Sequence, residues 1–180
     1  MMKLTSREAR ELLENERENT KDDRWIEHCV SVGDSAGVIA QALCEKGINV
    51  DVDKAIILGY LHDIGKYNGE SRGHVMRGYE YLKNKGYADE YANICLTHSY
   101  LNNDVTCTAG GGPKPEDNPF LTDFIKNHQY TIEEKIINLC DLMCPHGYKV
   151  FTIDKRLVDL IIRKGAYSNT QYHIKETYKL

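Results

Sequence analysis

His62 and Asp63 stand side by side at the end of an apolar segment, where a protein core would otherwise be expected. Burying an imidazole and a carboxylate without partners costs stability, so these groups need something that binds them. Two further groups of the same types, His28 and Asp141, also lie within apolar segments. A metal ion would neutralise the buried carboxylates and suits this mixture of ligands. The sequence therefore predicts a metal site built from His28, His62, Asp63 and Asp141.

Each of these residues has a simpler interpretation when it is taken alone. A single histidine or aspartate on a helix is more often solvated, or satisfied by a hydrogen bond, than bound to a metal. Their shared placement on helices that otherwise look buried is what favours the metal site.

Three capping patterns help to predict the helices that position these groups. Thr5 with Glu8, and Thr131 with Glu134, have the spacing of a capping box, and Asp51 is a suitable N-cap. Apolar residues recur at helical spacing, and no alternating strand pattern of convincing length occurs. We expect helices over 5–18, 25–46, 52–62, 74–85, 88–99, 132–144 and 154–164, and a short last one in the tail from Tyr167. The predicted fold class is all-α.

The segment between Ser99 and Pro119 has no periodicity and contains the run Gly110-Gly111-Gly112-Pro113. A connection of this length is uncommon in a compact domain unless it is functional or mobile. We interpret it as a candidate lid.

Length and charge limit the classes of function. A chain of 180 residues without a sharp change in composition fits a single domain over 1–180. The formal net charge of −4 gives no basic stripe, so a nucleic-acid polymer is not the expected partner, whereas small anions are compatible with it. No apolar run approaches the roughly 20 residues of a membrane span, so no membrane association is expected.

The chain has six cysteines, which could indicate a disulfide framework. No secretory signal precedes them, and five lie in helix-like apolar patterns: Cys29, Cys44, Cys95, Cys140 and Cys144. We therefore expect reduced thiols in the core of a cytoplasmic protein. The i, i+4 spacing of Cys140 and Cys144 could suggest metal ligation, but core packing is the preferred interpretation.

The order of the four proposed ligands, and the segment from Gly59 to Lys66 that reads Gly-Tyr-Leu-His-Asp-Ile-Gly-Lys, resemble the HD-domain superfamily of metal-dependent phosphohydrolases. The resemblance runs from about Trp25 to Lys149. It implies a helical bundle with its core over about 25–149, preceded by an N-terminal helix and followed by a helical tail.

Two more histidines resemble the ligands of family members that bind two metals. His74 lies 11 residues after Asp63, and His98 ends a predicted helix. The resemblance implies that both ligate a second ion, with Asp63 bridging the pair. The alternative is that His74 is a polar helix-start residue and His98 a helix-end residue favoured by the dipole. The expected cofactor is one or two divalent transition-metal ions, iron, manganese or zinc.

A site of this kind suits hydrolysis of a phosphoester or phosphoanhydride, because bound metal lowers the pKa of water and clamps phosphate oxygens. We expect Asp63 and Lys66 to be catalytic, with Lys66 neutralising charge on the phosphate. Arg72 and Arg77 flank His74 and are candidates for binding substrate, although surface ion pairing is the commoner role for arginine. No Walker loop or nucleophile triad motif supports another route.

The predicted substrate is a nucleotide or a related small phosphate compound, as the resemblance to the two-metal HDIG branch implies. Two alternatives stay open, a metal- and nucleotide-binding sensor without turnover and a di-iron oxygenase of the same fold. Cyclic dinucleotides are disfavoured because the Gly-Tyr-Pro signature is absent after His98. A homodimer is compatible with the sequence.

The remaining histidines are assigned other roles. His128 and His173 lie in polar segments and are expected to be solvated. His146 follows Pro145 and could approach the substrate or cap the preceding helix, the second being preferred.

Overall fold

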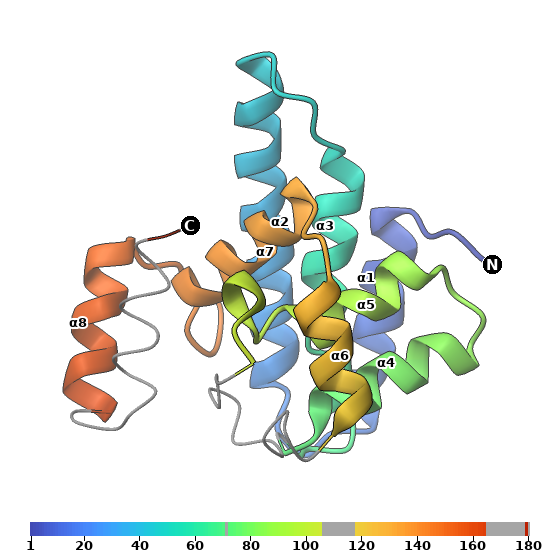
Figure 1. Ribbon diagram of the computed structural model, residues 1–180. Helices are drawn as coiled ribbons and strands as arrows, with labels where there is room; N and C mark the ends of the chain where they lie inside the picture. The colour runs from blue at the N-terminus through green and yellow to red at the C-terminus, as the bar shows by residue number, and fades with distance from the viewer. Residues whose placement is uncertain (71, 106–117, 165–178, 180) are drawn as a thin grey trace.

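The computed structural model describes residues 1–70, 72–105, 118–164 and 179. Within these ranges the chain forms α-helices and short 3-10 turns and no β-strand, which confirms the all-α prediction (Figure 1). The α-helices are α1 Ser6–Asn15, α2 Arg24–Glu45, α3 Val52–Leu61, α4 His74–Asn84, α5 Asp89–Thr97, α6 Pro119–Asn127, α7 Ile132–Met143 and α8 Ile153–Lys164. The 3-10 turns are η1 Glu16–Glu18, η2 Ile64–Lys66 and η3 Leu101–Asn103.

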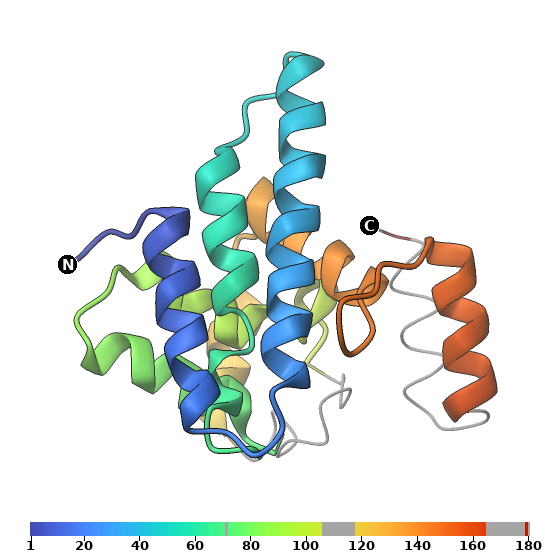
Figure 2. The same cartoon turned by 180° about the vertical axis from the view of Figure 1, so that it is seen from behind.

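The centre of the molecule is an antiparallel pair of helices. The long helix α2 runs beside α3, with α1 on the other side of α3 and α7 packed against α2 (Figures 1 and 2). The core between them is formed by fully buried apolar side chains that include Leu13, Ile26, Leu58, Leu61 and Ile137. Helices α4 and α5 pack on each other, α5 also contacts α3, and α8 contacts the bundle through α7.

Two glycines allow α2 and α3 to approach closely. A Cβ added to Gly59 would lie 2.5 Å from the Cα of Gly33, so the two backbones touch where only glycine fits. The contact lies one turn from His62 on α3, and His28 is on the facing helix α2. Close packing of the backbones is therefore what brings the histidines of two helices within reach of one ion.

Local sequence explains where the helices begin. Both capping boxes form as predicted, with the Thr5 and Thr131 hydroxyls accepting from the backbone N–H of Glu8 and Glu134. The Asp51 carboxylate likewise accepts from the N–H of Lys54 and caps α3. These bonds satisfy backbone donors that a helix start leaves unpaired.

The turn after α3 is shaped by a second close approach. A Cβ on Gly65 would lie 2.0 Å from the carbonyl oxygen of His74, so η2 is pressed against the start of α4. This contact sets the Asp63 carboxylate opposite the first residue of α4.

Two differences from the predicted elements have local causes. The first helix ends at Asn15 and continues as the 3-10 turn η1, rather than running to Glu18 as α-helix. Helix α6 was not predicted, although Asn118 caps it and Pro119 occupies its first turn. Its apolar side is short, with Leu121 and Ile125 buried, and it follows a glycine-rich segment that masks the signal.

The candidate lid lies largely outside the described residues, as do His173 and the predicted helix from Tyr167. The described cysteines carry no disulfide, and four of the five are buried, with Cys44 half-buried. None of the helices in the described ranges is long and apolar enough to cross a membrane.

A substitution at the glycine contact tests its role in stability. Gly59→Ala places a methyl group against the α2 backbone, which cannot rotate away, so we expect a loss of about 1–3 kcal/mol in the free energy of unfolding. Gly37→Ala is the matched control, because its methyl would meet the movable Ile56 side chain, at 2.8 Å from Cγ1. Urea unfolding should leave Gly37→Ala near the wild type. Equal losses in the two variants would contradict the proposed contact.

Candidate metal centre

Six side chains from five parts of the fold meet at one buried point. Helix α2 provides His28, the end of α3 provides His62 and Asp63, and α7 provides Asp141. The other two come from α4, which begins with His74, and from the residue after α5, which is His98. All but Asp141 are at most 5 % exposed. The structure therefore brings together every residue that the sequence predicts as a metal ligand, while their binding of metal stays a prediction.

The first group of potential ligands surrounds His28. Its Nε2 lies 3.0 Å from Oδ1 of Asp141 and 3.2 Å from Nε2 of His62. The His62 Nε2 is 3.7 Å from the same carboxylate oxygen. Three ligand atoms at these separations can surround one ion.

The second group surrounds Asp63. Its Oδ1 lies 3.1 Å from Nε2 of His74 and 3.5 Å from Nε2 of His98, and the two imidazole nitrogens are 3.3 Å apart. The other oxygen, Oδ2, is 3.7 Å from His28 and 3.6 Å from His62. The Asp63 carboxylate thus stands between the two groups, with one oxygen on each side.

The histidine tautomers identify which ring nitrogen faces the centre with a lone pair. The Nδ1 of His62 is 2.7 Å from the carbonyl of Gly59, and the Nδ1 of His98 is 3.1 Å from the carbonyl of Ile94. A carbonyl only accepts, so each Nδ1 must carry the hydrogen. In its neutral form each ring then points an unprotonated Nε2 inward, as metal-ligating histidines do.

Protonation of the histidines does not relieve the crowding of lone pairs throughout this site. Burial lowers the pKa of His62 to about 4, so this ring is neutral at pH 7. Its Nε2 lone pair then lies near His28 and two carboxylates. Within the described part of the chain, the buried Oδ1 of Asp63 accepts no hydrogen bond, despite the imidazole nitrogens close to it. Such clustered electron-pair donors fit a cation at their centre.

Charges at the site keep both carboxylates ionised. Burial opposes ionisation of Asp63, but Lys66 and the surrounding histidines outweigh it and hold its pKa well below the usual range. For Asp141, burial is likewise outweighed by the hydrogen bond with His28, so its pKa is also lowered. The Lys66 ammonium contacts Oδ2 of Asp63, and this carboxylate raises the pKa of Lys66 against the effect of burial. The site thus combines two anionic ligands with one fixed cation.

Cys29 is a further potential ligand, because its sulfur lies within 4.8 Å of ligand atoms of His62 and Asp63. Burial, with a contribution from Asp63, raises the pKa of this thiol well above its usual value. The thiolate is the form that binds metals, so the imidazoles and carboxylates are the better ligands.

A cavity of about 250 Å³ lies beside the cluster, lined by Asp22, Arg24, Trp25, Lys66, Gly69 and His146. The ring of His146 is 6.1 Å from that of His28, measured between centroids. His146 therefore lines the cavity beside His28, whereas its approach to a substrate, the interpretation that the sequence placed second, stays a prediction. The Asp141 side chain, 31 % exposed, is the most open of the ligands.

The two arginines predicted to bind substrate have different positions. Arg77 donates from Nε to the carbonyl of Gly65 at 2.6 Å and from Nη2 to the carbonyl of Glu70 at 2.5 Å. It therefore ties down the segment that carries Lys66. Arg72 is exposed beside this segment, and its backbone oxygen accepts from Arg77. Neither lines the cavity described above, and their contact with substrate stays a prediction.

A hydrogen-bonded clamp holds the end of α5, where His98 lies. The buried Glu134 carboxylate accepts from the Thr97 hydroxyl at 3.2 Å, lies 2.8 Å from Nε2 of His128 and accepts from the N–H of Thr131 at 2.9 Å. His128 is half-buried and stacks on Phe124, so the expectation that it is solvated was wrong. Sequence reasoning missed this clamp because its partners come from separate helices.

Comparison with known proteins agrees with the geometry. The sequence profile described as the HD domain matches residues 25–144. An uncharacterized protein of the archaeon Methanocaldococcus jannaschii is 28% identical over 148 residues, covering 81% of this chain and 78% of the archaeal protein. No solved structure matches the chain significantly.

The clamp yields a prediction about one group of ligands. Thr97→Val keeps the shape of a fully buried side chain but removes the hydroxyl that bonds Glu134. We expect affinity for an ion at Asp63, His74 and His98 to fall about 10–100-fold, as losses of such supporting bonds typically do. Affinity at His28, His62 and Asp141 should be unchanged.

Stepwise titration against a chelating competitor measures the two affinities separately. Thr97→Ser is the matched control, because it retains the hydroxyl and should bind both ions like the wild type. Equal weakening of both steps in Thr97→Val, or no weakening of either, would contradict the assigned role of the clamp.

Proposed function

The chain belongs to the HD-domain family, and from that premise we propose that it hydrolyses a nucleotide or a related small phosphate compound. HD-domain proteins are in general metal-dependent phosphohydrolases, and this chain has histidine and aspartate groups that could hold a divalent metal. The two-metal branch of the family, the nucleotide as substrate and iron, manganese or zinc as the metal belong to the proposal.

One observation supports the proposal most directly. The Asp63 carboxylate lies between two groups of potential ligands, with Oδ2 near His28 and His62 and Oδ1 near His74 and His98, and a cavity lined in part by Lys66 lies beside them. A site for one ion would need only three or four of these side chains. Six such side chains, arranged on both sides of one carboxylate, could hold two ions, which would supply Lewis acidity toward a phosphate.

Metal ions bound there would supply a water nucleophile at neutral pH and Lewis acidity toward phosphate oxygens. The chain's own residues hold and orient the reactants. Asp63 and Asp141 stay ionised, so they can serve as ligands throughout the physiological pH range. Lys66, whose side chain is 15 % exposed, reaches from Asp63 into the cavity and can neutralise charge on the phosphate.

The remainder of the cavity fits the organic part of a nucleotide. Trp25 is held by a hydrogen bond from its Nε1 to Thr20, at 3.2 Å, and offers a fixed aromatic wall. Arg24 forms a pair of short contacts with Asp22 at the exposed rim, where a second phosphate could compete for it. Arg72 remains a candidate for phosphate contact, and we propose Arg77 as a residue that positions the Lys66 segment.

Two substitutions separate the proposed roles of Asp63 and Lys66. Asp63→Ala removes the carboxylate shared by both ligand groups, so both metal content and phosphate release should be lost. Lys66→Ala removes one charge contact and should keep the metal while turnover falls by about two to three orders of magnitude. Phosphate release from a panel of nucleoside polyphosphates and monophosphates, measured beside elemental analysis, tests both expectations.

Lys83→Ala, an exposed lysine on α4, is the control and should behave as the wild type. A fully metal-loaded wild type that releases no phosphate from the panel would contradict hydrolysis. Nucleotide affinity without turnover would then favour a sensor, and oxygen uptake by the reduced iron form would favour an oxygenase.

A further inference from the structure

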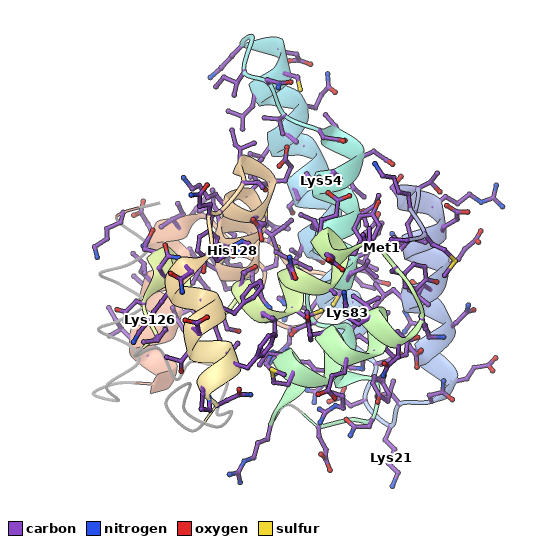
Figure 3. All side chains as sticks on the ribbon, turned by 45° about the vertical axis from the view of Figure 1, so that its right-hand side comes forward. Met1, Lys21, Lys54, Lys83, Lys126 and His128 are labelled. Atoms are coloured by element: carbon purple, nitrogen blue, oxygen red, sulfur yellow. The ribbon has the colours of Figure 1, made fainter. Side chains whose placement is uncertain are left out.

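A second cavity, of about 370 Å³, lies away from the substrate cavity and shares none of its lining residues. Its walls come from η3, from the linker between α6 and α7, and from one side of α7. The lining residues are Asn102, Asn103, His128, Gln129, Tyr130, Lys135 and Asn138. Figure 3 shows His128 at the junction of α6 and α7. The volume falls within the range of small-molecule sites, about 300–1,000 Å³.

Asn138 is the strongest indication of a ligand. Its side chain is 2 % exposed, and its buried Oδ1 has no hydrogen-bond partner within the described part of the chain. Leaving a buried acceptor unsatisfied costs about 1–3 kcal/mol, and a bound N–H donor would remove that cost. Asn138 is among the residues that line the cavity, so a ligand there lies next to its side chain.

The cavity walls are fixed before any ligand arrives. Asn103 donates from Nδ2 to the carbonyl of Ile125 at 2.6 Å and to that of His128 at 2.8 Å, which joins η3 to the end of α6. Asn102 and Asn103 both have positive φ, 55° and 61°, a conformation that is uncommon for residues other than glycine. The clamp through Glu134 fixes the His128 ring on the same wall. A preformed site loses little entropy on binding.

The chemistry of the lining identifies the class of ligand. The Asn138 carboxamide can pair with the donor and acceptor edge of a nucleobase, and Tyr130 and His128 provide aromatic surface beside it. Lys135 is exposed and adds a positive charge, and none of the seven lining residues carries a carboxylate that would repel an anion. We propose that this cavity binds a mononucleotide, with its base at Asn138 and its phosphate at Lys135.

This site is distinct from the proposed hydrolytic one but connected to it through two elements. Asn138 lies one turn before Asp141 on α7, and η3 begins three residues after His98. Binding at the cavity therefore contacts α7, which carries Asp141, and η3, which begins shortly after His98. The proposed hydrolysis could fail its own test without affecting this proposal.

Nuclear magnetic resonance of the zinc-loaded, nitrogen-15-labelled chain tests the site. The probe is the methylene-phosphonate analogue of AMP, whose carbon–phosphorus bond resists hydrolysis. The backbone amides of Asn102, Gln129 and Tyr130 should shift, together with the Asn138 side-chain amide. Lys135→Glu and Asn138→Leu should each raise the Kd at this cavity at least tenfold. Lys126→Glu, an exposed change on α6, should leave the Kd unchanged (Figure 3).

Lys66→Ala separates the two cavities, because it should weaken binding at the metal centre and leave these shifts intact. Shifts confined to Trp25, Lys66 and His146 would overturn the proposal. So would a Lys66→Ala variant in which the shifts at the second cavity disappear. Absence of binding, or a Lys135→Glu variant that binds like the wild type, would also overturn it. Lys135 is exposed, so this variant decides the question even if Asn138→Leu fails to fold.

Discussion

The structure depends on one constraint. Imidazole nitrogens and carboxylate oxygens face one another at the buried site, and there are too few hydrogens among them to pair every lone pair. The inward Nε2 of His62 cannot donate, because its Nδ1 hydrogen is committed to the Gly59 carbonyl. It nevertheless lies 3.2 Å from another imidazole nitrogen, beside an ionised Asp141. Repulsion among such groups opposes their close packing, and a cation at their centre would relieve it. The fold supplies the groups at fixed positions, and the ion would make those positions stable.

The helices hold these positions through backbone contacts as well as side-chain packing. Gly33 against Gly59 brings α2 to α3, and Gly65 against the start of α4 brings the Asp63 turn to His74. The Glu134 clamp then holds the remaining ligand, His98, from the side of α7. Because α7 also carries Asp141, both groups of ligands depend on the same helix. This explains why residues far apart in sequence can form one compact site.

The sequence predicted local features well because their causes are local. Capping by Thr5 and Thr131, and the approximate helix bounds, follow from residues a few positions apart. The proposed ligands were identified from their types and order, aided by a family resemblance. Sequence did not reveal the His128 contact with Glu134 or the cavity at Asn138, since these depend on how α6 and α7 meet. Helix α6 was itself missed beside the glycine-rich segment, which hid the elements that form this region.

Metal stoichiometry in two single variants tests the central claim most directly, since the two ligand groups predict separate losses. Elemental analysis of the wild type, loaded with manganese or zinc and freed of excess metal, should give two ions per chain. His28→Ala should lose the ion at His62 and Asp141, and His74→Ala the ion at Asp63 and His98, leaving one in each case. A wild type that holds no ion at all, or one ion that survives both substitutions, would contradict the assignment of this cluster as a two-metal centre.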